Sequence, residues 1–264
     1  MDLLLNGKRA LVTGSTSGIG WASARELAAE GAHVILNGRD PVRLASAVAR
    51  LQAELPLASV DGVAADLATS AGCQQLLAAA GELDILVNNL GIFEPKAFEQ
   101  ISDEDWTRFF EVNVMSGVRL ACHHLAGMKA RGWGRVVFIS SESGICPPGD
   151  MVHYGMTKSA QLSVSRGLAE TCAGTGVTVN SVLPGPTRTE GVDALFATLA
   201  RDAGQTLAQT EREFFKSGRP TSLLQRFIEP TEVAAMVAYV CSPRSAATNG
   251  AALRVDGGVV RSLI

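Results

Sequence analysis

Tyr154 and Lys158 are the residues whose types and spacing most directly suggest acid–base chemistry. They stand four residues apart in a stretch that predicts a helix, so their side chains share one face, with Cβ atoms about 5–6 Å apart. A free phenol has a pKa of about 10 and is a poor proton donor or acceptor near neutral pH. A neighbouring ammonium group stabilises the phenolate. The pair therefore predicts proton transfer by Tyr154, with the pKa of its phenol lowered by Lys158.

Two serines follow an apolar run at residues 135–139 that predicts a strand, and either hydroxyl suits the same chemistry. A hydroxyl at a strand end can donate a hydrogen bond to a substrate carbonyl oxygen as negative charge develops on it. Because side chains alternate along a strand, Ser140 and Ser141 point in opposite directions.

A glycine-rich turn follows the first apolar run, at residues 10–12. It reads Thr13-Gly14-Ser15-Thr16-Ser17-Gly18-Ile19-Gly20 and leads into helical periodicity up to Ala29. Glycine is needed where a side chain would block the backbone or a phosphate, and a helix N-terminus presents free N–H groups to a pyrophosphate. A strand before the turn and a helix after it predict a dinucleotide site. No Lys-Ser or Lys-Thr follows the last glycine, which argues against a nucleotide-hydrolysing P-loop.

Apolar runs alternate with helical stretches along most of the chain. Strands are predicted at 10–12, 33–36, 61–65, 84–87, 135–139, 177–182 and 251–255, and helices at 19–29, 41–53, 73–80, 105–129 and 154–172. Pro41 suits a first helical turn, and Ser102 with Asp105 fits a capping box. Strand–helix repetition requires crossover connections, so we expect an α/β fold: a single-domain, doubly wound, Rossmann-type parallel sheet of about seven strands with helices on both faces.

Residues 184–230 break this alternation, since they contain no predicted strand. Apolar residues at helical spacing within them predict an amphipathic helix (Val192, Leu195, Phe196 and Leu199), and Phe214 with Phe215 adds a second apolar patch. A long connection after the carboxyl end of a strand lies where open α/β sheets bind ligands. We interpret residues 184–230 as a substrate-lid insertion in a single domain that spans residues 1–264.

Composition and charge exclude several classes of protein. The net charge is −3 and no basic stripe is present, so nucleic acid is not an expected partner. The five scattered cysteines predict reduced, buried thiols, and the four histidines lack ligand spacing, so no metal is expected. The apolar run at the N-terminus is too short for the apolar region of a signal peptide, and no apolar run is long enough to span a membrane. We expect a soluble, cytoplasmic protein without a membrane partner.

The TGxxxGxG spacing of the glycine turn resembles that of the short-chain dehydrogenase/reductase family, closest in character to its 3-oxoacyl-carrier-protein reductase-like members. Family features follow in order along nearly the whole chain: Asp66, Asn88-Asn89-Leu90-Gly91, Asn113, Ser141, Tyr154-x-x-x-Lys158, Pro184-Gly185-Pro186-Thr187-Arg188-Thr189 and Val255-Asp256-Gly257-Gly258. Leu90 stands where relatives usually carry alanine, and the segment from Asp66 to Asn88 is several residues shorter than usual.

This resemblance implies that Asn113, Ser141, Tyr154 and Lys158 form the catalytic group. The family places its serine thirteen residues before the tyrosine, which selects Ser141. Hydride would pass between the nicotinamide C4 and a carbonyl carbon while Tyr154 protonates the oxygen. Lys158 would also hold the nicotinamide ribose, and Asn113 would hold a water that joins Lys158 to solvent.

The resemblance also implies the residues that bind the cofactor. They are Gly14, Ser15, Thr16, Ser17, Gly18, Ile19, Gly20, Arg39, Asp66, Leu67, Asn88, Gly91, Tyr154, Lys158, Pro184, Gly185, Thr187 and Thr189. Asp66 and the Leu67 backbone would hold the adenine, while Asn88 and Gly91 would lie against the riboses. Gly38 stands where NAD-preferring relatives carry an acid. Arg39 either binds a 2′-phosphate, or stacks on adenine or faces water. The expected cofactor is NADP, with NAD as the alternative.

The expected function is NADP(H)-dependent interconversion of a small-molecule ketone and a secondary alcohol, with a 3-oxoacyl thioester as the commonest family substrate. Alternatives are a sugar, polyol or steroid dehydrogenase and a non-catalytic nucleotide-binding protein. By position, residues Cys146, Pro147, Pro148 and Met151 line the substrate side, and with the Phe-bearing lid they indicate an apolar carbonyl substrate. His153 either reaches the site or is a solvated loop residue.

The oligomer is also inferred from the resemblance. Relatives pair the helices that correspond here to residues 105–129 and 154–172, so we expect a homodimer or homotetramer. The small residues Gly117, Ala121 and Ala169 would permit close packing of these helices.

Overall fold

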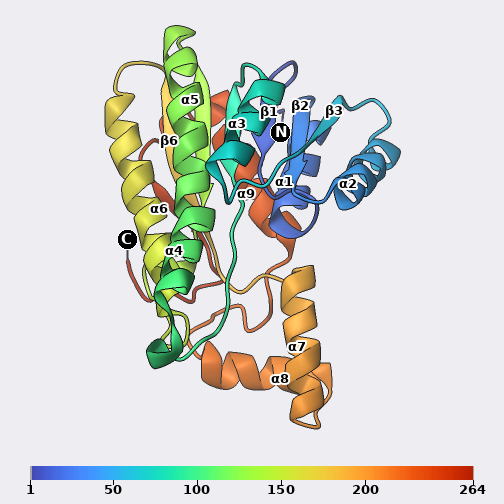
Figure 1. Ribbon diagram of the computed structural model, residues 1–264, viewed down its shortest axis with the longest axis vertical. Helices are drawn as coiled ribbons and strands as arrows, with labels where there is room; N and C mark the ends of the chain where they lie inside the picture. Colours follow the sequence, from blue (N-terminus) through green and yellow to red (C-terminus); the bar gives the residue numbers. More distant parts are fainter. Residues whose placement is uncertain (1, 264) are drawn as a thin grey trace.

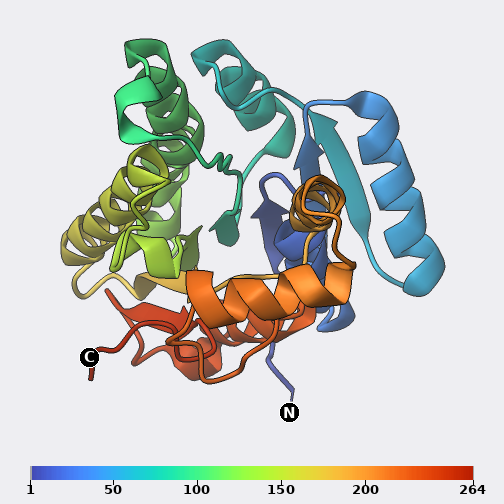
Figure 2. The same ribbon diagram turned by 90° about the horizontal axis from the view of Figure 1, so that it is seen from below.

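The computed structural model describes residues 2–263, which form one parallel sheet with helices on both faces (Figures 1 and 2). The strands are β1 (Arg9–Val12), β2 (His33–Gly38), β3 (Val60–Ala64), β4 (Ile85–Asn88), β5 (Gly134–Ile139), β6 (Val177–Pro184) and β7 (Ala252–Val255). Their order in the sheet is β3-β2-β1-β4-β5-β6-β7, and all pairs are parallel. The order reverses between β1 and β4, so ligands are expected beyond the carboxyl ends of these strands.

Two apolar cores, one on each face of the sheet, hold the layers together. On one face lie α1 (Gly18–Ala29), α2 (Pro41–Glu54) and α9 (Pro230–Cys241), and on the other α3 (Ser70–Ala80), α5 (Ser116–Ala130) and α6 (Val152–Thr171). In β2, Val34 and Leu36 pack into the first core and Ile35 into the second. Strands covered on both faces carry continuous apolar runs, such as residues 10–12 and 85–87, as the sequence pattern indicates. The doubly wound fold predicted from the sequence is confirmed.

The helix predicted over residues 105–129 is interrupted by a π-helical turn in the structure. It consists of α4 (Asp103–Phe110), a π-helical turn η2 (Glu111–Met115) and α5. The predicted capping box is present, because the backbone N–H of Asp105 donates to Ser102 Oγ and that of Ser102 to the Asp105 carboxylate, both at 3.2 Å. A 3.6-residue pattern does not reveal a π turn, and such turns are common at functional positions. This one contains Asn113.

The insertion between β6 and α9 forms a small helical unit beyond one end of the sheet (Figure 1). It contains α7 (Glu190–Asp202), α8 (Leu207–Glu213), a π turn η4 (Phe214–Gly218) and an isolated bridge from Thr187 to Ile228, so the predicted amphipathic helix is confirmed. Short 3₁₀ turns lie elsewhere at η1 (Phe98–Gln100), η3 (Glu142–Gly144) and η5 (Pro243–Ser245). An ion pair of 3.0 Å between Arg43 and Glu190 joins α2 to α7.

The phenylalanines of the insertion pack on one another. Phe196, Phe215 and Phe227 are at most 8% exposed, and their ring centroids and that of Phe214 lie 4.9–5.6 Å apart in the contacting pairs. These rings therefore form a local core that gives the insertion its shape. Of these rings only Phe214 is partly exposed, so they offer little apolar surface to a substrate, and an apolar carbonyl substrate stays a prediction.

Three further expectations are corrected by burial. Gly117, Ala121 and Ala169 pack inside the subunit, and a Cβ on Gly117 would lie 2.9 Å from the Phe138 ring, so they do not offer a surface to a second subunit. Cys73, Cys172 and Cys241 are buried, but Cys122 and Cys146 are exposed, contrary to the expected burial of all five thiols. His153 is fully buried in α6, with its ring centroid 4.0 Å from that of Phe109.

Within residues 2–263, no helix combines the length and the hydropathy needed to cross a membrane.

Candidate active site

The glycine turn is held in shape by the segment that follows β4. Gly14 and Gly18 have φ of +59° and +57°, which favour glycine, and a Cβ on Gly20 would overlap the Asn89 side chain. Asn89 Nδ2 donates to the carbonyl oxygens of Thr13 and Gly14 at 2.9 and 3.1 Å. The structure thus brings two of the sequence motifs together where β1 and β4 end.

Ser15 supports this turn from the inside. Its Oγ donates to the Val12 carbonyl at 2.7 Å and accepts from the Asn37 backbone N–H at 2.9 Å. Asn37 also donates to the carbonyls of Val63 and Ala65. Asn37 has no role among the sequence predictions. Its polar side chain directly after the predicted strand 33–36 was the signal that could have shown it. By contrast, Ser17 is the N-cap residue before α1 and its side chain makes no capping hydrogen bond, and Ile19 is half-buried.

The end of β2 is too crowded for a larger side chain at Gly38. A Cβ on Gly38 would lie 2.5 Å from Thr16 Cγ2, so a larger residue there requires Thr16 to move. Arg39 is exposed and makes no hydrogen bond or ion pair with another of the described residues. This guanidinium is therefore available to an anion that approaches the turn.

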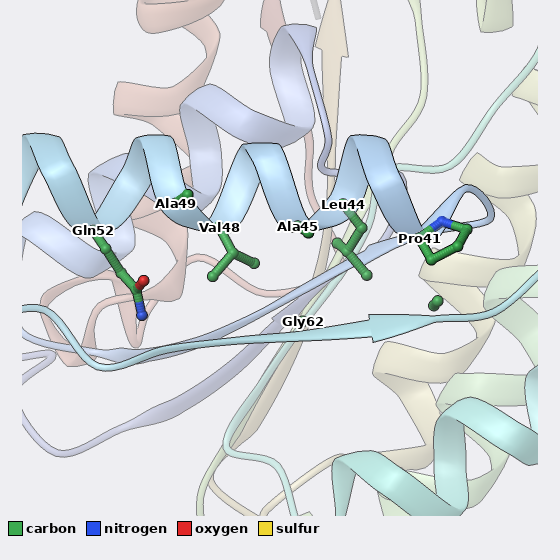
Figure 3. Close-up of a pocket in the computed structure, with 8 residues that line it drawn as sticks. Pro41, Leu44, Ala45, Val48, Ala49, Gln52 and Gly62 are labelled. Carbon is green, nitrogen blue, oxygen red and sulfur yellow. The ribbon is translucent and has the colours of Figure 1, made fainter.

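A shallow hollow of about 410 Å³ borders this region, between α2 and the edge strand β3 (Figure 3). Its lining is apolar apart from Gln52, and it includes Pro41, Leu44, Val48 and Gly62. Because none of its lining residues titrates, we do not consider it a site of reaction. It lies on the side of the sheet away from β5 and the catalytic candidates.

The first residues of the insertion pass over the glycine turn. Thr189 caps α7 by accepting from the Val192 backbone N–H at 3.3 Å, and a Cβ on Gly18 would lie 3.2 Å from Thr189 Cγ2. Thr187 Oγ1 donates to the Gly185 carbonyl at 2.9 Å, and Pro184 ends β6. The segment from Pro184 to Thr189 is therefore close to where the sequence predicts a pyrophosphate.

The remaining predicted cofactor residues follow β3 and β4. The carboxylate of exposed Asp66 accepts from the Ala68 backbone N–H at 3.1 Å, and Leu67 is buried. The side-chain amide of Asn88 is buried, and neither of its polar atoms has a partner among the described residues. A Cβ on Gly91 would lie 3.4 Å from Lys158 Nζ, so this glycine lies directly against the catalytic candidates.

Ser141 and Tyr154 meet as the sequence predicts. The Ser141 hydroxyl lies close enough to the phenol of Tyr154 to act on its pKa, in the lowering direction. Ser140 points the other way, since its Oγ donates to the backbone carbonyl of Lys158 at 2.9 Å. Of the two serines, Ser141 therefore lies on the side of Tyr154, and its catalytic role stays a prediction.

Lys158 is directed toward the backbone rather than toward the phenol. Its Nζ donates to the Ile139 carbonyl at 2.8 Å and to Gln161 Oε1 at 3.2 Å, and it lies 5.6 Å from the centroid of the Tyr154 ring. Burial lowers the pKa of Lys158 to about 7, an effect that the charge of Glu142 opposes.

The pKa of Tyr154 is raised in the structure, not lowered as the i, i+4 spacing predicted. Burial of the phenol is the main cause, and the nearby Ser141 hydroxyl acts in the lowering direction without cancelling it. The sequence expectation failed because it assumed that the ammonium of Lys158 would face the phenol, whereas this ammonium is hydrogen-bonded elsewhere.

Asn113 lies in the π turn, beside Lys158. Its Oδ1 accepts from the Ile92 backbone N–H at 2.8 Å, and its Nδ2 donates to the Ile92 carbonyl and to Thr157 Oγ1, both at 3.0 Å. Its backbone carbonyl accepts from Gln161 Nε2 at 2.6 Å. Gln161 therefore joins Asn113 to Lys158, a role that sequence reasoning missed although Gln161 follows Lys158 by three residues on one helix.

Glu142 and Arg219 form a second pair that the sequence analysis missed. The Glu142 carboxylate is buried next to Ser141, and Arg219, from the insertion, donates from Nε to its Oε1 at 3.2 Å. Both charges act on the pKa of Tyr154. An acid directly after the serine was the available signal. Cys146 and Pro147, by comparison, lie on an exposed loop after η3.

Comparisons with known proteins agree with this geometry. A family model described as enoyl-(acyl carrier protein) reductase matches residues 14–260. The chain is 52% identical to uncharacterized oxidoreductase YvaG of Bacillus subtilis (strain 168) over 263 residues, which cover 100% of both chains. The chain belongs to the short-chain dehydrogenase/reductase family. The members of this family named here are oxidoreductases and reductases, and this chain is an oxidoreductase of the same family.

Two further members of the short-chain dehydrogenase/reductase family bear on substrate and cofactor. The chain is 33% identical to 3-oxoacyl-[acyl-carrier-protein] reductase FabG of Aquifex aeolicus (strain VF5), covering 98% of this chain and 100% of the relative. It is also 33% identical, with a TM-score of 0.93 and full coverage of both chains, to L-sorbose reductase from Gluconobacter frateurii, which was solved with NADPH and L-sorbose. In residues 2–263 of this chain, no three His, Cys, Asp or Glu side chains gather to hold a metal ion.

Proposed function

We propose that the protein is an NADP(H)-dependent oxidoreductase that interconverts a ketone and a secondary alcohol. The observation that carries this proposal is the pairing of Ser141 and Tyr154 with the ammonium of Lys158 close by, against Gly91 and the glycine turn. When bound, the nicotinamide supplies or accepts the hydride. The residues of the chain position the reacting carbonyl and move the proton.

The features at the end of β2 support NADP as the cofactor. The closeness of Gly38 to Thr16 disfavours an acidic side chain, and the unpaired Arg39 suits a 2′-phosphate. The glycine turn would take the pyrophosphate and the Pro184–Thr189 segment would cover it. The NADPH-bound L-sorbose reductase of the same fold supports this assignment.

In reduction, Tyr154 donates its proton to the carbonyl oxygen and Ser141 donates a hydrogen bond to it. The raised pKa of Tyr154 keeps the phenol protonated and ready for this direction. Lys158, held by Ile139 and Gln161, lies where it can hold a ribose and assist the return of the proton. Asn113 and Gln161 extend this hydrogen-bonded network away from the phenol.

Two substrate classes are consistent with the relatives. A 3-oxoacyl thioester is suggested by the Aquifex reductase, and a sugar or polyol by the L-sorbose reductase. The insertion at residues 184–230 is the proposed substrate lid. A cytoplasmic location and a homodimer or homotetramer remain predictions from the family resemblance, and sedimentation as a monomer at micromolar concentration would contradict the oligomer.

The test measures oxidation of NADPH and of NADH with acyl thioesters, diketones, steroids and sugars. Tyr154→Phe should abolish turnover with every ketone. The variant should still bind NADPH, as measured by the change in fluorescence on binding. Tyr239→Phe is the matched control, since Tyr239 is the other tyrosine of the chain and is exposed on α9. Full activity in Tyr154→Phe would overturn the proposed function.

A further inference from the structure

A carboxylate lies buried directly beside the catalytic serine. Glu142 is only 4% exposed. Its Oε2 accepts hydrogen bonds from Ser141 Oγ, from the Ser143 backbone N–H at 2.9 Å and from Ser143 Oγ at 3.2 Å. A buried carboxylate is costly unless its oxygens are paired and hydrogen-bonded. These contacts therefore hold Glu142 in one position at the site.

The insertion supplies the cation that pairs with Glu142. Arg219 follows η4, and its side chain is 17% exposed. Its Nε donates to Glu142 Oε1 at 3.2 Å, whereas Ser141 is hydrogen-bonded to the other carboxylate oxygen, Oε2. Its Nη1 donates to the Gly218 carbonyl at 2.9 Å. The pair is neutral as a whole and presents Oε2, an acceptor, toward Ser141 and Tyr154. Such a surface favours a neutral donor group and disfavours an anionic substrate.

The hydroxyl of Ser141 has a single proton, and that proton is donated to Glu142. The Oγ atom accepts from the Ser143 backbone N–H at 3.1 Å, and the hydroxyl lies close enough to the phenol of Tyr154 to act on its pKa. When Ser141 instead donates to a substrate carbonyl oxygen, Oε2 of Glu142 loses its shortest hydrogen bond. Oε2 then keeps its two donors from Ser143, and a hydroxyl of the bound substrate can take the place of the third.

A hydroxyl on the carbon next to the carbonyl is placed to supply this third hydrogen bond. That hydroxyl and the carbonyl oxygen are on adjacent carbons, and Oε2 and the carbonyl oxygen both lie within hydrogen-bond reach of Ser141 Oγ. We propose that Glu142 is a specificity-determining residue that selects hydroxyketones, by accepting a hydrogen bond from this hydroxyl while Arg219 holds the carboxylate in place. The proposal rests on the proposed function, and it favours a polyol-type substrate over a 3-oxoacyl thioester, which carries no donor at that carbon.

The test compares two ketones of the same carbon skeleton, 3-hydroxybutan-2-one and butan-2-one, as substrates for NADPH oxidation. The wild-type kcat/KM should be at least ~100-fold higher for the hydroxyketone, because sites that hydrogen-bond a substrate hydroxyl reject analogues that lack it. In Glu142→Leu the ratio should fall below about 10. Glu142→Gln should lie between the two, because its amide oxygen still accepts. Acetoacetate, an anionic ketone, should be a poorer substrate than the hydroxyketone.

Arg219→Gln should raise KM for the hydroxyketone more than it lowers kcat. Arg226→Gln is its matched control: Arg226 lies in the same insertion, forms a surface ion pair with Glu232 and should leave both constants unchanged. Thermal unfolding and NADPH binding establish that each variant is folded.

A wild-type ratio near one, an unchanged ratio in Glu142→Leu, or a preference for acetoacetyl thioester over the hydroxyketone would overturn the inference alone. Failure to reduce any ketone, or full turnover by Tyr154→Phe, would instead contradict the proposed function.

Discussion

The side chain of Gln161 connects Lys158 to Asn113. Lys158 Nζ donates to Gln161 Oε1 at 3.2 Å, and Gln161 Nε2 donates to the Asn113 carbonyl at 2.6 Å. All three residues are at most 4% exposed. The link between the lysine and the asparagine is therefore made by a side chain of the protein itself.

Replacing Gln161 with Leu should therefore impair both stability and turnover. The change leaves the Asn113 carbonyl and the Lys158 ammonium each without one buried partner, so we expect the free energy of unfolding to fall by about 2 kcal/mol and kcat to fall roughly tenfold. Urea unfolding and steady-state kinetics measure the two effects. Gln161→Glu keeps the acceptor for Lys158 and adds a negative charge, which should raise the pKa of the lysine. Unchanged kcat in the Leu variant would show that Gln161 acts only in folding.

The fold and much of the site were predictable from the sequence, because periodicity reports burial and the motifs report backbone constraints. The glycine turn needs positive φ at Gly14 and Gly18. Strand alternation separates Ser140 from Ser141, and the resemblance to the family selects Ser141 through its spacing from Tyr154. Glu142, Arg219 and Gln161 were not predicted, since each acts through a contact distant in sequence. The direction in which the pKa of Tyr154 shifts was also missed, because i, i+4 spacing indicates proximity but not where an ammonium group points.

Tyr154 should stay protonated up to pH 10 in the enzyme without nucleotide. Burial raises the pKa of its phenol above the ordinary value near 10. In Tyr239→Phe, Tyr154 is the single tyrosine, so near-ultraviolet absorption of tyrosinate reports it directly. We expect no tyrosinate below pH 10, and a lower midpoint on adding oxidised NADP, whose positive ring stabilises the phenolate. A midpoint between pH 7 and 9 without nucleotide would contradict the effect of burial.

Lys158 should make the stability of the protein depend on pH. Its pKa is lowered by burial to about 7 in the folded chain and returns to its ordinary value near 10.5 on unfolding. Between these values the unfolded chain binds more protons than the folded chain, so the free energy of unfolding rises with pH. The rise from pH 7 to 9 should exceed that of Lys158→Met by about 2 kcal/mol.

Denaturant unfolding of both proteins at several pH values measures this difference. The buried thiols Cys73 and Cys241, whose pKa values are raised by burial, act in the opposite direction at higher pH but are common to both proteins and cancel in the comparison. Parallel curves for wild type and Lys158→Met would show that the lysine keeps an ordinary pKa.

Cofactor preference should be reversible at the end of β2. Gly38→Asp alone should weaken both NADPH and NADH, because the new Cβ would lie 2.5 Å from Thr16 Cγ2. Thr16→Ser removes that methyl group, so Gly38→Asp with Thr16→Ser should bind NADH again, while the carboxylate repels a 2′-phosphate. We expect the NADPH-to-NADH ratio of kcat/KM to fall roughly 100-fold, about 2.7 kcal/mol.

Two single variants control for this double change. Thr16→Ser by itself should leave the cofactor ratio near that of the wild type, because it removes only the methyl group. Arg39→Ala should weaken NADPH much more than NADH, since the guanidinium is exposed and unpaired among the described residues and is free to bind the phosphate. Equal losses for the two cofactors in Arg39→Ala would remove the 2′-phosphate from the role assigned to this arginine, and the preference would then depend on Gly38 and Thr16 alone.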